Sequence, residues 1–277
     1  MAFTSYAQNF EDLTLWRSLQ FFDPGYYIDV GANHPTHDSV TRALYELGWR
    51  GINIEPVAAY HRALVSERGE DINLCMAVGA QEETLTLHEI ANSGLSTLDS
   101  AVAEQNRQAG MQVTTYQVPV RRLADICAEH LAQDKPLHFL KIDVEGFEMQ
   151  VLEGMDFQRW RPWIVLLESP FDRIPEWEQL LLDAGYLFVQ FDAINRFYVA
   201  KEHANLAVPL RMPPNFLDGF RVARHHFLMR DQPDGSELQR QLDEARERAE
   251  QAERELTVLR SSRRWKLAGA LAKMAGR

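Results

Sequence analysis

The 277-residue sequence has few cysteines, no long apolar run and no surplus of basic residues, and each shortage excludes a class of protein. Cys75 and Cys127 form neither a CxxC pair nor a zinc-type cluster, so we expect reduced thiols. No run of about 18 apolar residues is present and the N-terminus does not resemble a signal peptide, so we expect a cytoplasmic protein. The formal net charge of -11 argues against nucleic-acid binding, which requires a basic face.

What the sequence does contain is an alternation of apolar strand-like runs and amphipathic helical stretches, with 45% hydrophobic residues overall. The runs over residues 186–191 and 196–199 predict an antiparallel hairpin that turns at residues 192–195. This order predicts an α/β fold with a mostly parallel sheet and an antiparallel edge hairpin. Residues 91–116 lack a clean period, and we expect a loop and irregular helix that form a lid over a pocket.

The stretch from Tyr26 to Pro35 is an apolar strand that enters a tight turn at Gly31. Glycine allows the sharp turn and the close approach of a ligand. In a doubly wound fold, ligands lie beyond the carboxyl ends of such strands. Asp29 lies at the end of this strand and Glu55 ends the next apolar run, so the pattern predicts a nucleoside-binding edge with two acids.

Motifs spread in order over residues 5–220 resemble the FkbM family of S-adenosylmethionine-dependent O-methyltransferases. They include Tyr27-Ile28-Asp29-Val30-Gly31-Ala32-Asn33, Glu55-Pro56, Ala77-Val78-Gly79, Leu140-Lys141-Ile142-Asp143-Val144-Glu145-Gly146-Phe147-Glu148 and Asn195-Arg196-Phe197-Tyr198-Val199. The resemblance implies a Rossmann-like class I methyltransferase sheet that acts on hydroxyl groups, often of sugars or natural products.

The cofactor implied by the resemblance is S-adenosylmethionine. The turn has one glycine where a dinucleotide fingerprint has three, which disfavours a nicotinamide cofactor. Asp29 and Gly31 are predicted to form the floor of the cofactor site, and Asn33 is predicted to bind the cofactor beside them. Glu55 is predicted to bind the ribose hydroxyls, and Ala77 to supply backbone around the adenine.

Methyl transfer to a hydroxyl requires removal of the hydroxyl proton. Asp143 and Glu145, after the apolar run 137–144, are candidates to take this proton or to hold a divalent metal, and His34 is a third candidate. Glu168 is a candidate for binding the acceptor or a metal, with helix capping or a salt bridge as its alternative. Asn195, Arg196 and Tyr198 on the hairpin are candidates for the acceptor site, and purely structural roles stay open for Arg196 and Tyr198.

The character of the chain changes after residue 230, which ends the predicted methyltransferase domain 1–230. Apolar residues at strict heptad spacing over residues 236–260 predict a coiled coil with a second copy or another protein, namely Leu238, Leu242, Ala245, Ala249, Ala252, Leu256 and Leu259. Residues 261–277 carry five Lys/Arg and no acid, which predicts an amphipathic tail at an anionic membrane surface. A surface helix of a monomer and a frayed basic tail are the alternatives.

The sequence therefore predicts an O-methyltransferase for a sugar hydroxyl. The Ser262-Arg263-Arg264-Trp265 stretch resembles the end of bacterial surface-polysaccharide enzymes, which points to a polysaccharide or glycolipid acceptor and to peripheral attachment at the inner face of the membrane. A lipid-linked or small natural-product hydroxyl is a second option. A methyltransferase-like scaffold that tethers a membrane-associated assembly through its coiled coil is the non-enzymatic alternative.

Overall fold

The structure is a computed structural model that describes residues 3–22, 24–91, 93–132, 134–169, 173–229 and 235–261. Contacts divide the chain into two units, residues 1–227 and 228–277. Within the described residues, no helix is both long and apolar enough to cross a membrane.

The first unit is built on a seven-stranded sheet in the order β10-β11-β9-β8-β2-β3-β4. Its strands are β2 (Tyr26–Val30), β3 (Arg50–Ile54), β4 (Ile72–Leu74), β8 (Phe139–Ile142), β9 (Ile164–Glu168), β10 (Tyr186–Phe191) and β11 (Asn195–Ala200). The strands from β4 to β9 pair in parallel, and β11 pairs antiparallel with both β9 and β10. The expected α/β fold with a mostly parallel sheet is confirmed, although the reversed strand β11 lies inside the sheet and β10 forms the edge.

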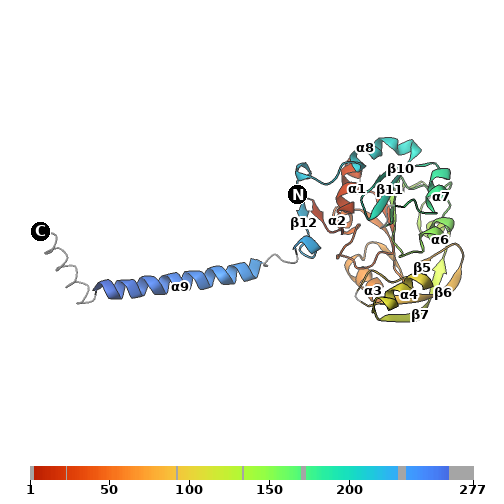
Figure 1. Ribbon diagram of the computed structural model, residues 1–277. Coiled ribbons are helices and arrows are strands. Elements are labelled where there is room, and N and C mark those ends of the chain that lie inside the picture. Colours follow the sequence, from red (N-terminus) through yellow and green to blue (C-terminus); the bar gives the residue numbers. More distant parts are fainter. Residues whose placement is uncertain are drawn as a thin grey trace. The chain divides into compact units, whose positions relative to one another are not determined.

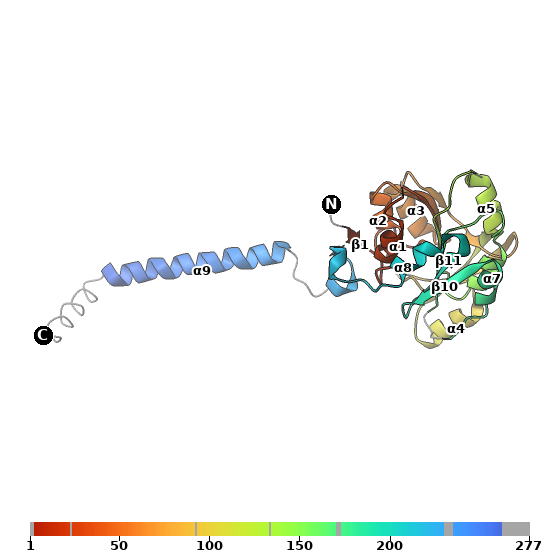
Figure 2. The ribbon, with the colours of Figure 1, turned by 90° about the horizontal axis from the view of Figure 1, so that it is seen from above.

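Helices cover both faces of this sheet (Figures 1 and 2), and an apolar core lies between the sheet and each helical layer. Alternate residues of the central strands point to opposite faces, so Ile28 and Leu140 pack against helices α5 (Leu123–His130), α6 (Glu148–Glu153) and α7 (Glu178–Asp183). Tyr27 and Phe139 face the other way and pack with α1 (Glu11–Leu19), α2 (Arg42–Glu46) and α8 (Ala207–Leu210). Helix α3 (Ala58–Glu67) contacts β4.

A small three-stranded sheet stands beside the main one, in the order β5-β7-β6. Its strands are β5 (Ala77–Val78), β6 (Glu83–Ile90) and β7 (Val113–Arg121), and helix α4 (Ser100–Gln108) lies between β6 and β7 in the chain (Figure 1). Residues 73–78 are a mostly apolar run in the sequence, but they do not form one strand. The run divides into β4, which extends the main sheet, and β5, which pairs with β7.

Helix α1 begins only at Glu11, and the preceding Thr4–Ser5 form strand β1, which pairs with β12 (Arg221–Val222). Asp12 accounts for the late start, since its carboxylate accepts hydrogen bonds from the Ser5 hydroxyl and the backbone N–H groups of Tyr6 and Ala7. Two short 3-10 helices complete the unit, η1 (Lys201–Leu206) and η2 (Phe216–Asp218), and a third, η3 (Phe227–Met229), lies at the boundary between the two units.

The second unit contains α9 (Gly235–Ser261), a continuous helix of 27 residues. It covers the helix expected over residues 236–260. Leu242, one of the heptad residues, is 46% exposed. Residues 262–277, most of the expected basic tail, lie outside the described residues.

Candidate functional site

A cavity of about 260 Å³ lies beyond the carboxyl ends of β2, β3, β8 and β9. The parallel pairing of these strands brings their ends to one edge, which is where a doubly wound sheet binds its ligands. Eight of the residues predicted from the sequence line this cavity, namely Asp29, Gly31, Asn33, Glu55, Ala77, Asp143, Glu145 and Glu168. The structure therefore brings the predicted cofactor residues and the three acids together.

The turn after β2 closes tightly against the end of β8. Gly31 has a φ of 74°, and a Cβ atom at this position would lie 1.8 Å from the carbonyl oxygen of Asp143. The N–H groups of Gly31 and Ala32 donate to the carbonyl of Ile54 over 3.0 and 3.2 Å. Residue 31 must therefore be a glycine, since both its dihedral angles and the adjacent backbone exclude a side chain.

Glu55, the acid after β3, is 5% exposed and already holds the turn in place. Its two carboxylate oxygens accept the N–H groups of Asn33 over 2.8 Å and of Val57 over 2.7 Å. Burial raises the pKa of Glu55 to about 7, against the lowering effect of these hydrogen bonds. Each oxygen keeps a second lone pair, so the carboxylate can still accept hydrogen bonds from a ligand in the cavity.

Asn33 has a positive φ of 50°, and the Oδ1 atom of its side chain is buried without a hydrogen-bond partner among the described residues. Because asparagine tolerates the left-handed conformation better than most residues, the backbone here is compatible with its side chain. A buried amide oxygen without a partner is costly unless a ligand supplies a donor. The cavity thus offers a free acceptor beside Glu55.

Lys141 is a site residue that the sequence reasoning missed. It stands in the otherwise apolar strand β8, directly opposite Asp29 in the register of β2 and β8. Its ammonium donates to the carbonyl of Gly31 over 2.7 Å and lies 3.3 Å from Asp29 and 3.2 Å from Asp143. Burial lowers the pKa of Lys141, but the carboxylates of Asp143 and Asp29 outweigh it and raise the pKa. The sequence does contain a signal for this residue, namely a lysine within an otherwise apolar, strand-like run.

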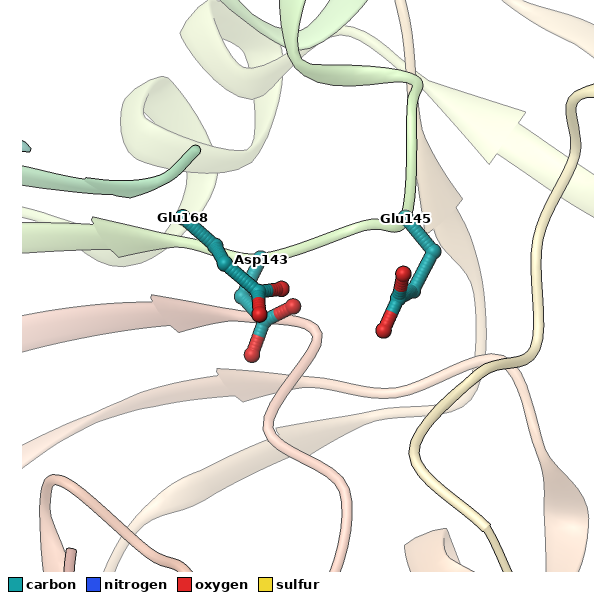
Figure 3. Close-up of side chains that lie close together, drawn as sticks. All are labelled: Asp143, Glu145 and Glu168. Carbon is teal, nitrogen blue, oxygen red and sulfur yellow. The ribbon is translucent and has the colours of Figure 1, made fainter. Parts of the chain in front are cut away.

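Asp143, Glu145 and Glu168 converge at the other end of the cavity (Figure 3). One carboxylate oxygen of each lies within 4.8 Å of the others, a spacing at which they can share one divalent cation. Glu145 has a φ of 53° and precedes Gly146, whose φ is 100°, so a backbone turn after β8 aims Glu145 at the end of β9.

The three acids differ in charge state. Burial raises the pKa of Asp143, but the ammonium of Lys141 and a hydrogen bond from Glu168 outweigh it, so the net shift is downward. Burial and the charge of Asp143 raise the pKa of Glu168 well above its usual value, so it is the protonated partner. Burial and the charges of Asp143 and Glu148 raise the pKa of Glu145 to about 8.

The opposite wall comes from the small sheet and the segment before α4. Met76, Leu87 and Leu98 give it an apolar surface, and residues 93–96 also line the cavity. The backbones of His88 and Thr97 bond to each other over 2.9 and 3.0 Å, and the Thr97 hydroxyl donates to the carbonyl of Glu145 over 2.7 Å. Residues 93–98, part of the segment expected to form a lid, are therefore a wall of the cavity, and Thr97 joins this wall to the backbone of Glu145 by a hydrogen bond.

Four predicted site residues do not line the cavity. The Nδ1 atom of His34 accepts the N–H groups of Thr36 and His37, both over 3.1 Å, so this nitrogen is engaged within its own turn.

The other three lie on β11, which is buried between β9 and β10. Asn195 donates to Glu11, Tyr198 donates to Glu178, and Arg196 lies 3.5 Å from the Glu178 carboxylate. These contacts tie the three side chains to the protein itself, although the Nε atom of Arg196 has no hydrogen-bond partner among the described residues.

Almost all residues that line the cavity lie in a part of the chain that matches a known protein family. Residues 29–188 match the methyltransferase FkbM domain. Over 78 residues, the chain is 36% identical to methyltransferase sdnD of Sordaria araneosa, an alignment that spans 25% of this chain and 30% of that relative. A solved structure of precorrin-6y C5,15-methyltransferase from Geobacter metallireducens GS-15 aligns over 69% of this chain and 88% of its own, at 13% identity and a TM-score of 0.37. The family match covers more than half of the chain and includes all eight predicted residues that line the cavity, so the protein belongs to the FkbM methyltransferase family.

Proposed function

We propose that this protein is an S-adenosylmethionine-dependent O-methyltransferase with a Rossmann-like class I sheet, and that its acceptor is a hydroxyl of a sugar in a polysaccharide or glycolipid. The observation that carries the proposal is the convergence of a glycine turn, a ribose-type acid and three carboxyl groups on one cavity, in a chain of the FkbM family.

The cavity has the features that the cofactor requires. Gly31 allows the turn at the cavity to pack against the end of β8, and Glu55 has free lone pairs for two ribose hydroxyls. The buried amide oxygen of Asn33 has no hydrogen-bond partner among the described residues and can accept a donor from the ligand. Ala77 and its neighbours in β5 present an apolar slot of the kind that a purine base prefers. When bound, S-adenosylmethionine supplies an electrophilic methyl group.

The acids then act on the acceptor. Asp143, which Lys141 keeps ionised, accepts a hydrogen bond from the acceptor hydroxyl and orients it. Glu145 takes the proton, because its pKa, raised to about 8, lies near neutral pH, where an effective general base has its pKa. Glu168, which is protonated, donates to Asp143 and leaves its second oxygen for another acceptor hydroxyl.

A divalent cation is an alternative occupant of the acid cluster. Three carboxyl oxygens within 4.8 Å suit a hard cation, which would lower the pKa of an acceptor hydroxyl. Under this alternative, methyl transfer depends on added Mg²⁺ and stops with chelator. Under the proton-acceptor mechanism, chelator leaves the rate unchanged.

The second unit carries a separate proposal. We infer that α9 pairs with a second copy or another protein as a coiled coil, because Leu242, Ala245, Ala249 and Ala252 form one stripe of an exposed helix. The basic residues 261–277 would then hold the protein at the inner face of the membrane, near a lipid-linked acceptor. If the protein is instead a non-catalytic scaffold that tethers an assembly, it would keep its pairing and membrane attachment after substitution of Asp143, Glu145 and Glu168.

Two measurements test the proposed function. Calorimetry with S-adenosylmethionine and its demethylated product should show binding to the wild type that Glu55→Gln weakens. Incubation with cofactor labelled in the methyl group and a panel of sugars, glycolipids and small hydroxyl compounds should then label one class. No binding of either nucleoside would refute the enzyme. Binding without transfer, together with normal cellular function of Asp143→Ala, would support the scaffold.

A further inference from the structure

The 3-10 turn η2 on the surface of the first unit exposes two large apolar side chains side by side in sequence. Phe216 is 88% exposed and Leu217 is 79% exposed, and Met212 a few residues earlier is 49% exposed. Single exposed apolar residues are common on protein surfaces, but two adjacent ones at a turn are a small contiguous patch. The question is why the fold holds them outward.

The turn is fixed from both sides by hydrogen bonds. The Asn215 side chain accepts the N–H of Leu217 over 3.0 Å, and Asp218 accepts the N–H of Asn215 over 2.8 Å, which forms a capping box. Gly219, with a φ of 59°, ends the turn. The exposed pair therefore stands on a defined piece of backbone.

A buried arginine anchors this turn to the body of the unit. Arg17 of α1 is 9% exposed and its guanidinium binds both oxygens of Asp218, over 3.0 and 2.6 Å. The same guanidinium donates to the backbone carbonyls of Pro209, Met212 and Pro213. One buried cation thus holds both the segment before the turn and the turn itself, so the backbone that carries the two apolar side chains is fixed in place.

The charge around the turn is positive, in contrast to the chain as a whole. Arg211 and Arg221 flank it within five residues of Phe216, and both side chains are on exposed positions. The single acid between them, Asp218, is neutralised by Arg17. A protein with a formal net charge of -11 is repelled from an anionic surface as a whole. The segment around this turn, with Arg211 and Arg221, would instead be attracted to such a surface.

We propose that the Phe216–Leu217 turn is a membrane-docking tip that inserts into the interface of an anionic lipid bilayer. A protein partner needs a matching area of about 800 Å² on each side, which one turn does not offer. A bilayer needs no complementary shape, since a few apolar side chains enter the boundary of headgroups and acyl chains while flanking arginines contact the anionic headgroups. The proposal does not depend on the enzymatic activity.

An environment-sensitive fluorophore on the tip tests this directly. The full chain with Cys75→Ser and Leu217→Cys is labelled with NBD and titrated with vesicles of phosphatidylcholine alone or of phosphatidylcholine mixed with the anionic phosphatidylglycerol. We expect a blue shift and an intensity rise with the anionic vesicles only. The same label at Val65→Cys, an apolar position that is 49% exposed on α3, is the matched control and should not respond.

Co-sedimentation of unlabelled protein gives the second readout. Phe216→Ser with Leu217→Ser should weaken binding to the anionic vesicles by about tenfold or more, since each side chain loses its transfer from water. Val65→Ser should bind like the wild type. The proposal is overturned if the chain sediments with vesicles while the label at residue 217 stays in water, because another segment then makes the contact. It is also overturned if the label shifts without vesicles as protein concentration rises, because a second copy then covers the tip.

Discussion

Replacement of Gly31 by alanine is the sharpest test of the turn that forms the floor of the cavity. The substitution adds one methyl group where the φ is 74° and where a Cβ atom would lie 1.8 Å from the Asp143 carbonyl oxygen and 2.9 Å from its carbon. Both atoms belong to backbone, so no side chain can rotate away. The end of β8 or the turn itself must move.

The cost follows from the contacts that such a movement breaks. The left-handed conformation alone costs an alanine about 1 to 2 kcal/mol. Separation of the two backbones strains the Asp143 N–H bond to Val30 and the Lys141 bond to the Gly31 carbonyl, which are worth about 1 and about 2 kcal/mol. We expect Gly31→Ala to lower the free energy of unfolding by about 4 to 5 kcal/mol, which is a large part of a typical domain's stability.

Gly110→Ala is the matched control. Gly110 has a φ of 84° and no atom within 4 Å of its Cβ position, so it isolates the dihedral cost of about 1 to 2 kcal/mol. Urea unfolding of both variants gives the two free energies, and calorimetry with S-adenosylmethionine shows whether the folded Gly31→Ala protein still binds. Equal losses of stability in the two variants would refute the steric reasoning, and unchanged cofactor affinity in Gly31→Ala would remove the turn from the cofactor site.

Four further predictions concern the ionisable groups. Glu55→Gln should weaken S-adenosylmethionine binding by about 10- to 100-fold in calorimetry, because hydrogen bonds to a charged acceptor are worth about 1.5 to 3 kcal/mol; a change below twofold would contradict the ribose role. The pKa of Glu55 is about 7 when folded and about 4.5 when unfolded, so its contribution to stability is present at low pH and is lost as the pH rises from 4.5 to 7; between pH 5 and 8 the wild type should lose about 2 to 3 kcal/mol more than Glu55→Gln in urea unfolding. Asp143→Asn should lower the rate of methyl transfer by about 10²- to 10⁴-fold with little change in cofactor affinity, and equal losses in both would assign Asp143 to the cofactor. Lys141→Met should destabilise the protein by about 3 to 5 kcal/mol because it leaves the buried Asp29 unpaired, and adding Asp29→Asn should recover part of this loss.

The residues at strand ends could be located from the sequence because parallel strands bring their carboxyl ends to one edge. Asp29, Glu55, Asp143 and Glu168 each follow or end an apolar run, so a single topological rule places them together. The α/β class followed from the same alternation. These predictions needed no knowledge of which strands are neighbours.

Predictions that depended on strand order or register could not be made in this way. Lys141 meets Asp29 because β8 pairs with β2 in one particular register, across more than a hundred residues of chain. The hairpin that carries Tyr198 was predicted correctly, but β11 pairs with both β9 and β10, so Tyr198 lies in a core and not at the cavity. The division of residues 73–78 between two sheets likewise depends on partners that a local pattern does not contain.

The hydrogen bond from the Thr97 hydroxyl to the Glu145 carbonyl joins the wall of the cavity to one of its acids. Glu145 also holds a positive φ, so its side-chain direction depends on this backbone staying in place. Entry of a ligand and the position of the acid therefore depend on the same hydrogen bond. If residues 93–98 move aside to admit a ligand, the Glu145 carbonyl loses the Thr97 hydroxyl as its donor, and the backbone that orients the Glu145 side chain is no longer held. Return of the wall restores both at once, so we expect the site to be reactive only when it is closed.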